Sequence, residues 1–178
     1  MLLTSREIKA MTEKGLLVRD MIDPGVQIQQ CGIDLTVASV FRLEGEGVLD
    51  FTNENRRLPQ YVEVPPAEDA FWMLQPGVYH IAFNEKIVLP NNIAGFLMPR
   101  SSALNCGIVQ HTAVWDPGYE GRSFFHAETS RPVKIFRNAR LGQMVFFRLS
   151  SDTAGYSGMY KGEDILKFAK RGAAEEKS

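Results

Sequence analysis

The sequence predicts an all-β protein, a sandwich or a barrel, with one short helix at the start. Short apolar runs with strand-like alternation recur along the chain, and Gly, Pro and Asn residues separate them. No strand–helix alternation of the kind that builds a parallel sheet is present. The 178 residues suit one domain with a sizeable core, and no internal repeat stands out.

The N-terminal helix is predicted by its capping signals. Thr4 followed by Glu7 forms a capping box, Ile8 and Met11 give one apolar face, and Gly15 ends the helix. We expect this helix to pack on the main body and to carry no chemistry.

The next segment is expected to be extended, with a turn at 23–25 (Asp-Pro-Gly) and a strand at 31–41. Asp34 lies inside this strand, although Asp is unfavourable there by β-propensity. Two interpretations of Asp34 stay open: a solvated strand edge, and a carboxylate placed there for function.

Further strands are expected along the rest of the chain, and His80 is expected to lie on one of them in a structural role. The predicted strands and buried runs are 48–51, 61–64, 71–74, 78–83, 87–89, 93–98, 124–127, 133–136 and 141–147.

From about residue 150 the residues are mostly small and polar, and Gly is frequent. Tyr and Lys donors between 155 and 162 suit an arm that closes over a ligand, although a plain surface tail has the same composition. A short helix is expected at 163–170 and disorder from Arg171 onward. We therefore assign 1–162 to one domain with its arm, and 163–178 to a partly disordered C-terminal extension.

Charge and composition exclude several classes of partner. The formal net charge of −1 leaves no general attraction to nucleic acid or to an anionic membrane. No apolar run approaches the roughly 20 residues of a membrane helix, and the N-terminus lacks a signal-peptide pattern. Cys31 and Cys106 have no partner at metal-binding spacing, which favours buried free thiols, with a disulfide as the alternative. A reducing, cytoplasmic location is expected.

Several common catalytic motifs are absent from the sequence. There is no P-loop, no HExxH, no Cys/His set at zinc spacing and no GxSxG. The histidines at positions 80, 111 and 126 have no obvious acidic orienter nearby in sequence.

Polar residues between 98 and 122 offer the remaining chemistry. Arg100, Ser101 and Ser102 provide donors for phosphate oxygens, as in non-helical anion nests. Asp116 follows Val-Trp and precedes Pro-Gly, where a strand breaks into a turn. This carboxylate is either a simple turn former or a group that orients or deprotonates water. Together these residues suggest hydrolysis of a phosphorylated small molecule.

Four segments resemble, in the same order, the motifs of the dUTPase and dCTP deaminase superfamily. They are Gly-Ile-Asp-Leu at 32–35, Pro-Arg-Ser-Ser at 99–102, Ala-Val-Trp-Asp-Pro-Gly-Tyr-Glu-Gly at 113–121 and Arg-Leu-Gly-Gln-Met at 140–144. The resemblance extends from Thr4 to about Gly162. It implies a distorted β-sandwich or jelly roll of the dUTPase-like β-clip type, in a homotrimer whose active sites lie between subunits.

The segment 112–123 is similar to archaeal dUTPases of the deaminase-like branch, which implies hydrolysis of dUTP to dUMP and pyrophosphate. Under this resemblance Asp116 activates the water that attacks the α-phosphate. Tyr119 packs on the deoxyribose, and a hairpin at 107–113, which includes Thr112 and Ala113, reads uracil through backbone groups.

The resemblance also implies how the triphosphate is held. The residues implied to bind it are Arg100, Ser101, Ser102 and Gln143, with Tyr156, Tyr160 and Lys161 closing over it and Asp34 supporting the site. Mg²⁺ is expected as the cofactor. It would be carried by the substrate phosphates and needs no direct protein ligand, because Mg²⁺ prefers phosphate oxygens and retains waters.

Two positions depart from the pattern of the deaminase branch. Asn105 stands where that branch has an Arg, and His126 stands where it has its catalytic Glu. Glu128 shares a strand face with His126, and a two-residue slip would restore the deaminase pattern. A dCTP deaminase, a bifunctional deaminase/dUTPase and a catalytically reduced nucleotide-binding regulatory protein therefore stay open as alternatives.

Overall fold

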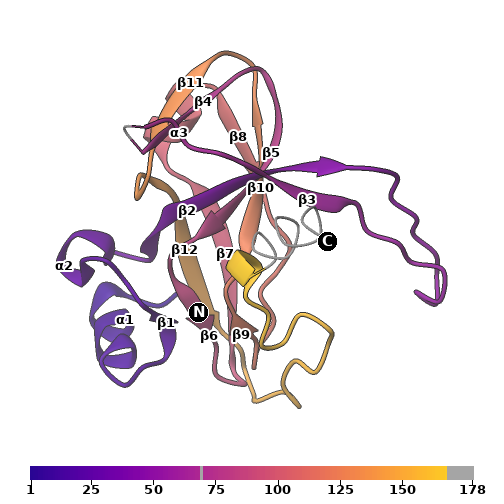
Figure 1. Ribbon diagram of the computed structural model, residues 1–178. Helices are drawn as coiled ribbons and strands as arrows, with labels where there is room; N and C mark the ends of the chain where they lie inside the picture. The colour runs from indigo at the N-terminus through magenta and orange to yellow at the C-terminus, as the bar shows by residue number, and fades with distance from the viewer. Residues whose placement is uncertain (69, 168–178) are drawn as a thin grey trace.

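A computed structural model describes residues 1–68 and 70–167, and it confirms an all-β fold with a short N-terminal helix (Figure 1). The strands are β1 (Leu17–Arg19), β2 (Ile33–Glu44), β3 (Gln60–Val64), β4 (Phe71–Leu74), β5 (Gly77–Phe83), β6 (Lys86–Val88), β7 (Ile93–Pro99), β8 (Ile108–His111), β9 (Glu120–Gly121), β10 (Phe124–Thr129), β11 (Val133–Phe136) and β12 (Arg140–Arg148). The helices are α1 (Ser5–Thr12), α2 (Pro24–Gln27), α3 (Ser101–Asn105) and the 3₁₀ turn η1 (Ile165–Lys167).

The main sheet runs in the order β7-β12-β2-β5-β10-β8, with β3 paired to the outer half of β2. Two smaller sheets, β1-β6-β9 and β4-β11, accompany it, and the strand pairs are antiparallel. This order places β12 between β7 and β2, so the motifs at 32–35, 99–102 and 140–144 lie on neighbouring strands, whereas the motif at 113–121 lies elsewhere.

Strand β2 has two different halves. Its residues from Ile33 to Phe41 are buried on both faces, whereas Arg42–Glu44 are exposed in a hairpin with β3 that projects from the body (Figure 1). The prediction of a strand at 48–51 is wrong, because only the isolated bridge between Val48 and Arg57 forms in the loop of this hairpin.

Helix α1 confirms the predicted capping box. The Thr4 hydroxyl accepts from the Glu7 amide, and the Glu7 carboxylate accepts from the Thr4 amide at 3.0 Å. Ile8 is buried, and Gly15 has the positive φ of +72° that ends the helical segment.

The turn predicted at 23–25 is instead the start of a helix. Asp23 caps α2, its carboxylate accepting from the Gly25 amide at 2.9 Å, and Pro24 occupies the first helical turn. Asp-Pro-Gly favours a tight turn and a helix start equally well, since Pro pre-sets the φ angle that both require.

The remaining expectations have mixed outcomes. Both cysteines are free, but only Cys31 is partly buried, so the expectation of a buried thiol is wrong for Cys106, which is exposed. Within the described residues, no helix combines the length and apolar character needed to cross a membrane. The predicted helix at 163–170 is represented by η1, and the disorder predicted from Arg171 lies outside the described residues. The division at residue 162 stays a prediction.

Candidate active site

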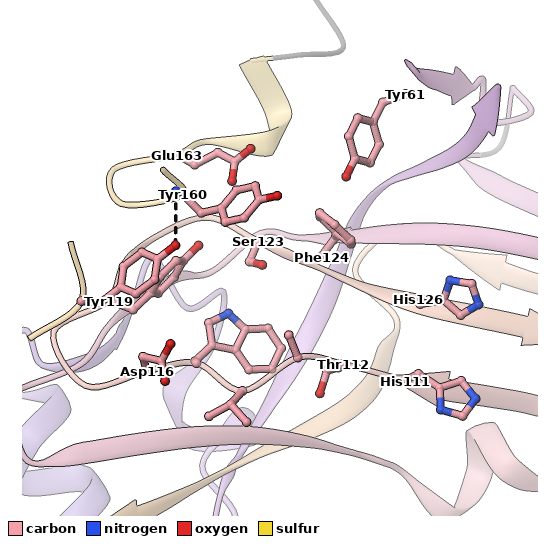
Figure 2. Close-up of a pocket in the computed structure, with 14 residues that line it drawn as sticks. Tyr61, His111, Thr112, Asp116, Tyr119, Ser123, Phe124, His126, Tyr160 and Glu163 are labelled. Atoms are coloured by element: carbon pink, nitrogen blue, oxygen red, sulfur yellow. Dashed lines mark hydrogen bonds between the residues drawn. The ribbon is translucent and has the colours of Figure 1, made fainter. Parts of the chain in front are cut away.

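A pocket of about 510 Å³ lies where the chain leaves β8, beside β10 and beneath the C-terminal arm, defined here as residues 155–163 (Figure 2). Aromatic side chains make up much of its wall. It is lined by Tyr61, His111, Thr112, Ala113, Val114, Trp115, Asp116, Tyr119, Ser123, Phe124, His126, Tyr156, Tyr160 and Glu163.

Asp116 is held on the pocket wall by its backbone. The preceding Trp115 is buried and exchanges two backbone hydrogen bonds with Gly95, at 2.9 and 3.0 Å. The Asp116 carbonyl accepts from the Tyr119 amide at 3.1 Å and closes the turn. The Asp116 carboxylate is exposed and makes no hydrogen bond or ion pair to any described residue, so it is available to water or a ligand.

Tyr119 forms the buried floor beside Asp116. Burial raises the pKa of Tyr119 to about 12, so its phenol stays a neutral donor at neutral pH. Its ring lies 5.8 Å from that of Tyr156, which reaches over from the arm. The two tilted rings give one end of the pocket an aromatic wall.

The C-terminal arm is fastened to the turn that carries Asp116. The Tyr156 amide donates to the Pro117 carbonyl at 2.7 Å. A Cβ on Gly118 would lie 2.8 Å from the Gly155 Cα, so only glycine permits this approach, and its φ of +80° favours glycine as well.

Arg122 fixes the far end of the arm. Its guanidinium pairs with Asp164 and with Asp20, both at 2.9 Å. Its amide donates to the Glu163 carbonyl at 2.8 Å. The predicted arm therefore lies over the pocket, with Tyr156 and Tyr160 in its wall, whereas Lys161 is exposed and does not line it.

Glu163 is a pocket residue to which the sequence analysis gave no role. Its carboxyl is half-buried and lines the pocket, and burial raises its pKa. The nearest sequence signal is the Tyr-Lys-Gly-Glu run at 160–163, which resembles the deaminase branch but does not show where the carboxyl points.

Asp34 is the centre of a second cluster. Its carboxylate pairs with Arg100 Nε at 3.1 Å and Arg140 Nη1 at 3.2 Å, and it accepts from Gln143 Nε2 at 3.3 Å. The side chain is 1% exposed, so the interpretation of Asp34 as a solvated strand edge is wrong. A register shift in β12 between Arg140 and Gly142 adjoins the contact. Such bulges re-aim side chains.

Ser101 and Ser102 lie next to this cluster, but not in the predicted non-helical nest. They form the first turn of α3, with Arg100 as its N-cap, and both are exposed. The predicted hairpin at 107–113 is also wrong. Strand β8 pairs with β10 and not with its own continuation, and 112–114 is irregular.

The structure thus divides the predicted site residues between two places. The pocket brings together Thr112, Ala113, Asp116, Tyr119, Tyr156 and Tyr160. Arg100, Ser101, Ser102, Gln143 and Asp34 do not line that pocket in the same chain. Among the described residues, no group of three or more His, Cys, Asp or Glu side chains is arranged to hold a metal ion.

The expectation that no histidine has an acidic orienter nearby in sequence is wrong for His126, whose neighbour is Glu128, two residues further on. His126 Nε2 lies 3.2 Å from a Glu128 oxygen, and His126 Nδ1 lies 3.3 Å from His80 Nε2. Burial, assisted by His126, lowers the pKa of His80 to about 4, so His80 is neutral at neutral pH.

The comparison with known proteins assigns this fold and site to a class. The chain belongs to the dCTP deaminase-like family, whose sequence profile matches residues 2–149. This match confirms the resemblance drawn from the four motifs.

Two similar relatives come from archaea. The chain is 47% identical over 137 residues to the deoxyuridine 5′-triphosphate nucleotidohydrolase of Methanocaldococcus jannaschii, covering 76% of this chain and 88% of that protein. It is 46% identical over 166 residues to a probable deoxyuridine 5′-triphosphate nucleotidohydrolase of Archaeoglobus fulgidus, covering 92% and 97%.

Among solved structures, the 2′-deoxycytidine 5′-triphosphate deaminase of Agrobacterium tumefaciens superposes with a TM-score of 0.63 at 20% identity. The match covers 82% of this chain and 47% of that chain, so the chain spans about half of the solved protein. At this identity the likeness supports the fold alone.

Proposed function

We propose that this protein hydrolyses dUTP to dUMP and pyrophosphate. The observation that carries the proposal is the Asp116 carboxylate, which is exposed on the pocket wall without a protein partner, beside the buried Tyr119. The archaeal relatives named as deoxyuridine triphosphate nucleotidohydrolases support the same reaction.

The proposed chemistry is one displacement at phosphorus. Asp116 accepts a proton from a bound water as the water oxygen bonds to the α-phosphorus. The bond from that phosphorus to the oxygen bridging to the β-phosphate breaks, and pyrophosphate leaves with the electron pair. Tyr119 packs against the deoxyribose, and the backbone of Thr112 and Ala113 faces the base.

The pocket carboxylates fit a metal that arrives with the substrate. Asp116 and Glu163 are the carboxylates in the pocket lining, and an Mg²⁺ held by the substrate phosphates could meet them through the waters that it keeps, which leaves Asp116 free to accept the proton. When bound, Mg²⁺ would neutralise charge on the triphosphate. Removing it with EDTA should abolish turnover, and adding Mg²⁺ back should restore it.

We propose further that two subunits of a homotrimer share each site. Support comes from the separation of the predicted phosphate donors from the pocket of their own chain. Two defective chains test this: Asp116→Asn, and the double variant Ser101→Ala/Ser102→Ala. After mixing and subunit exchange, activity should recover well above either parent. No recovery, or a monomeric molar mass in solution, would contradict shared sites. The cytoplasmic location stays a prediction.

Incubation of the purified protein with dUTP and, separately, with dCTP tests the reaction. Pyrophosphate from dUTP with unchanged dCTP is the expected result. Formation of a deoxyuridine nucleotide from dCTP would show the deaminase or bifunctional alternative. Binding of dUTP without turnover would instead favour the regulatory alternative.

A further inference from the structure

The three histidines of the chain converge on one end of the pocket. Strand register places His126 of β10 opposite His80 of β5 on one side and opposite His111 of β8 on the other. His111 and His126 line the pocket, at the end away from Asp116 and Tyr119 (Figure 2). Phe124 stacks on His80 with 4.4 Å between ring centroids, which makes this end flat and aromatic.

The hydrogen-bond network fixes the protons on two of these rings. An ionised Glu128 can only accept, so the proton of neutral His126 lies on Nε2. His126 Nδ1 then carries no proton and acts as the acceptor. His80 Nε2 must carry a proton and donate it to His126 Nδ1. His80 Nδ1 is left bare, which agrees with its burial without a hydrogen-bond partner among the described residues.

The burial of His80 also disfavours a proton on Nδ1 of His126. If Nδ1 of His126 gained a proton, His80 would have to accept it and move its own proton to Nδ1. That nitrogen is buried without an acceptor, and a buried, unsatisfied N–H is costly. Glu128 and His80 therefore favour the tautomer of His126 that carries its N–H at Nε2 and leaves Nδ1 as an acceptor.

We propose that His126 determines the base specificity of the pocket, by donating its Nε2–H to the 4-carbonyl oxygen of uracil. The 4-amino group of cytosine cannot accept this bond. The inference rests on the proposed function, which places the base beside Thr112 and Ala113. The Glu128 side chain is 54% exposed, so its bond to His126 is weak enough for a carbonyl to displace or share it.

Binding of two non-hydrolysable probes tests the proposal. The probes are the α,β-imido triphosphates of deoxyuridine and deoxycytidine, titrated by calorimetry. His126→Leu removes the donor and should weaken the deoxyuridine probe about 10- to 100-fold, while the deoxycytidine probe changes less than about threefold. His126→Asn keeps an N–H donor and should retain part of the preference. Glu13→Gln, at the exposed end of α1, is the control that should leave both affinities unchanged.

Proton positions can be read independently of nucleotide. In ¹⁵N-edited NMR of the wild-type protein, His126 and His80 should both appear protonated at Nε2. A His126 protonated at Nδ1 alone would overturn the proposal. Glu128→Leu removes the acceptor and should mix the His126 tautomers.

The outcomes separate this inference from the proposed function. If His126→Leu hydrolyses dUTP and keeps the wild-type ratio of probe affinities while unfolding at the wild-type temperature, the specificity role is wrong and the hydrolase assignment stands. If the wild-type protein neither binds the deoxyuridine probe nor hydrolyses dUTP, the proposed function fails and takes this inference with it.

Discussion

Asp34 and Asp116 have the same side chain in opposite surroundings. Asp34 is buried, pairs with Arg100 and Arg140, and accepts from Gln143. Asp116 is exposed on a pocket wall, is held by backbone contacts alone, and makes no side-chain bond to a described residue. A carboxylate whose acceptor capacity is filled by the protein organises structure. One that is left open can bind water or substrate.

The largest expected effect comes from Asp116→Asn, which tests whether the open carboxylate is needed for activity. Removal of the proton acceptor should lower turnover of dUTP more than about 10³-fold, with nucleotide affinity within about tenfold of wild type. Stability should change by less than about 0.5 kcal/mol, because this carboxylate has no protein partner. Pyrophosphate release and urea unfolding measure the two quantities. Wild-type turnover would contradict the role.

The same substitution at Asp34 tests whether the buried carboxylate is needed for stability. Asp34→Asn leaves two arginines without their counter-charge and should lower the free energy of unfolding by about 2–3 kcal/mol. This is less than for a fully buried pair, because Arg100 and Arg140 keep contact with water. Urea unfolding beside Asp116→Asn makes the matched pair. Equal losses of stability in the two variants would contradict the distinction.

His80, which lies behind the pocket against His126 and Phe124, gives the fold a pH-dependent contribution to stability. Its pKa falls from 6.5 to about 4 on folding, so its neutral form favours the folded state above pH 6.5. As the pH falls from 6.5 toward 4, the unfolded chain binds a proton at His80 and the folded chain does not. The free energy of unfolding therefore decreases by about 2–3 kcal/mol. His80→Phe should remove this part of the slope. An unchanged slope in urea unfolding at pH 4–7 would contradict it.

The smallest effects are expected at the arm. Arg122→Leu should loosen the arm, which should weaken nucleotide binding about 3- to 10-fold and speed proteolysis between 155 and 163. The free energy of unfolding should fall by about 1 kcal/mol. Asp164→Asn should reproduce much of this. Asp20→Asn should do less, because Asp20 is the more exposed partner. A larger effect of Asp20→Asn than of Asp164→Asn would contradict the assignment of Asp164 as the more important partner of Arg122.

Alternation and turn residues predicted most of the strands, because β5, β10 and β12 carry long runs bounded by clear turns. Helices α2 and α3 were missed, since helices of four or five residues have too little periodicity to show in a sequence. The partners of Asp34 and the contact of His126 with His80 depend on strand register across distant segments. Local sequence does not encode that register.

The placement of the arm has a consequence for the order in which the protein becomes competent during translation. The arm follows every strand of the sheets in the chain, yet it supplies Tyr156, Tyr160 and Glu163 to the pocket. Chains begin to fold from the N-terminus as they are synthesised. A nascent chain can therefore complete its sheet while the pocket still lacks one wall, and it gains the full pocket lining only after residue 163 has left the ribosome.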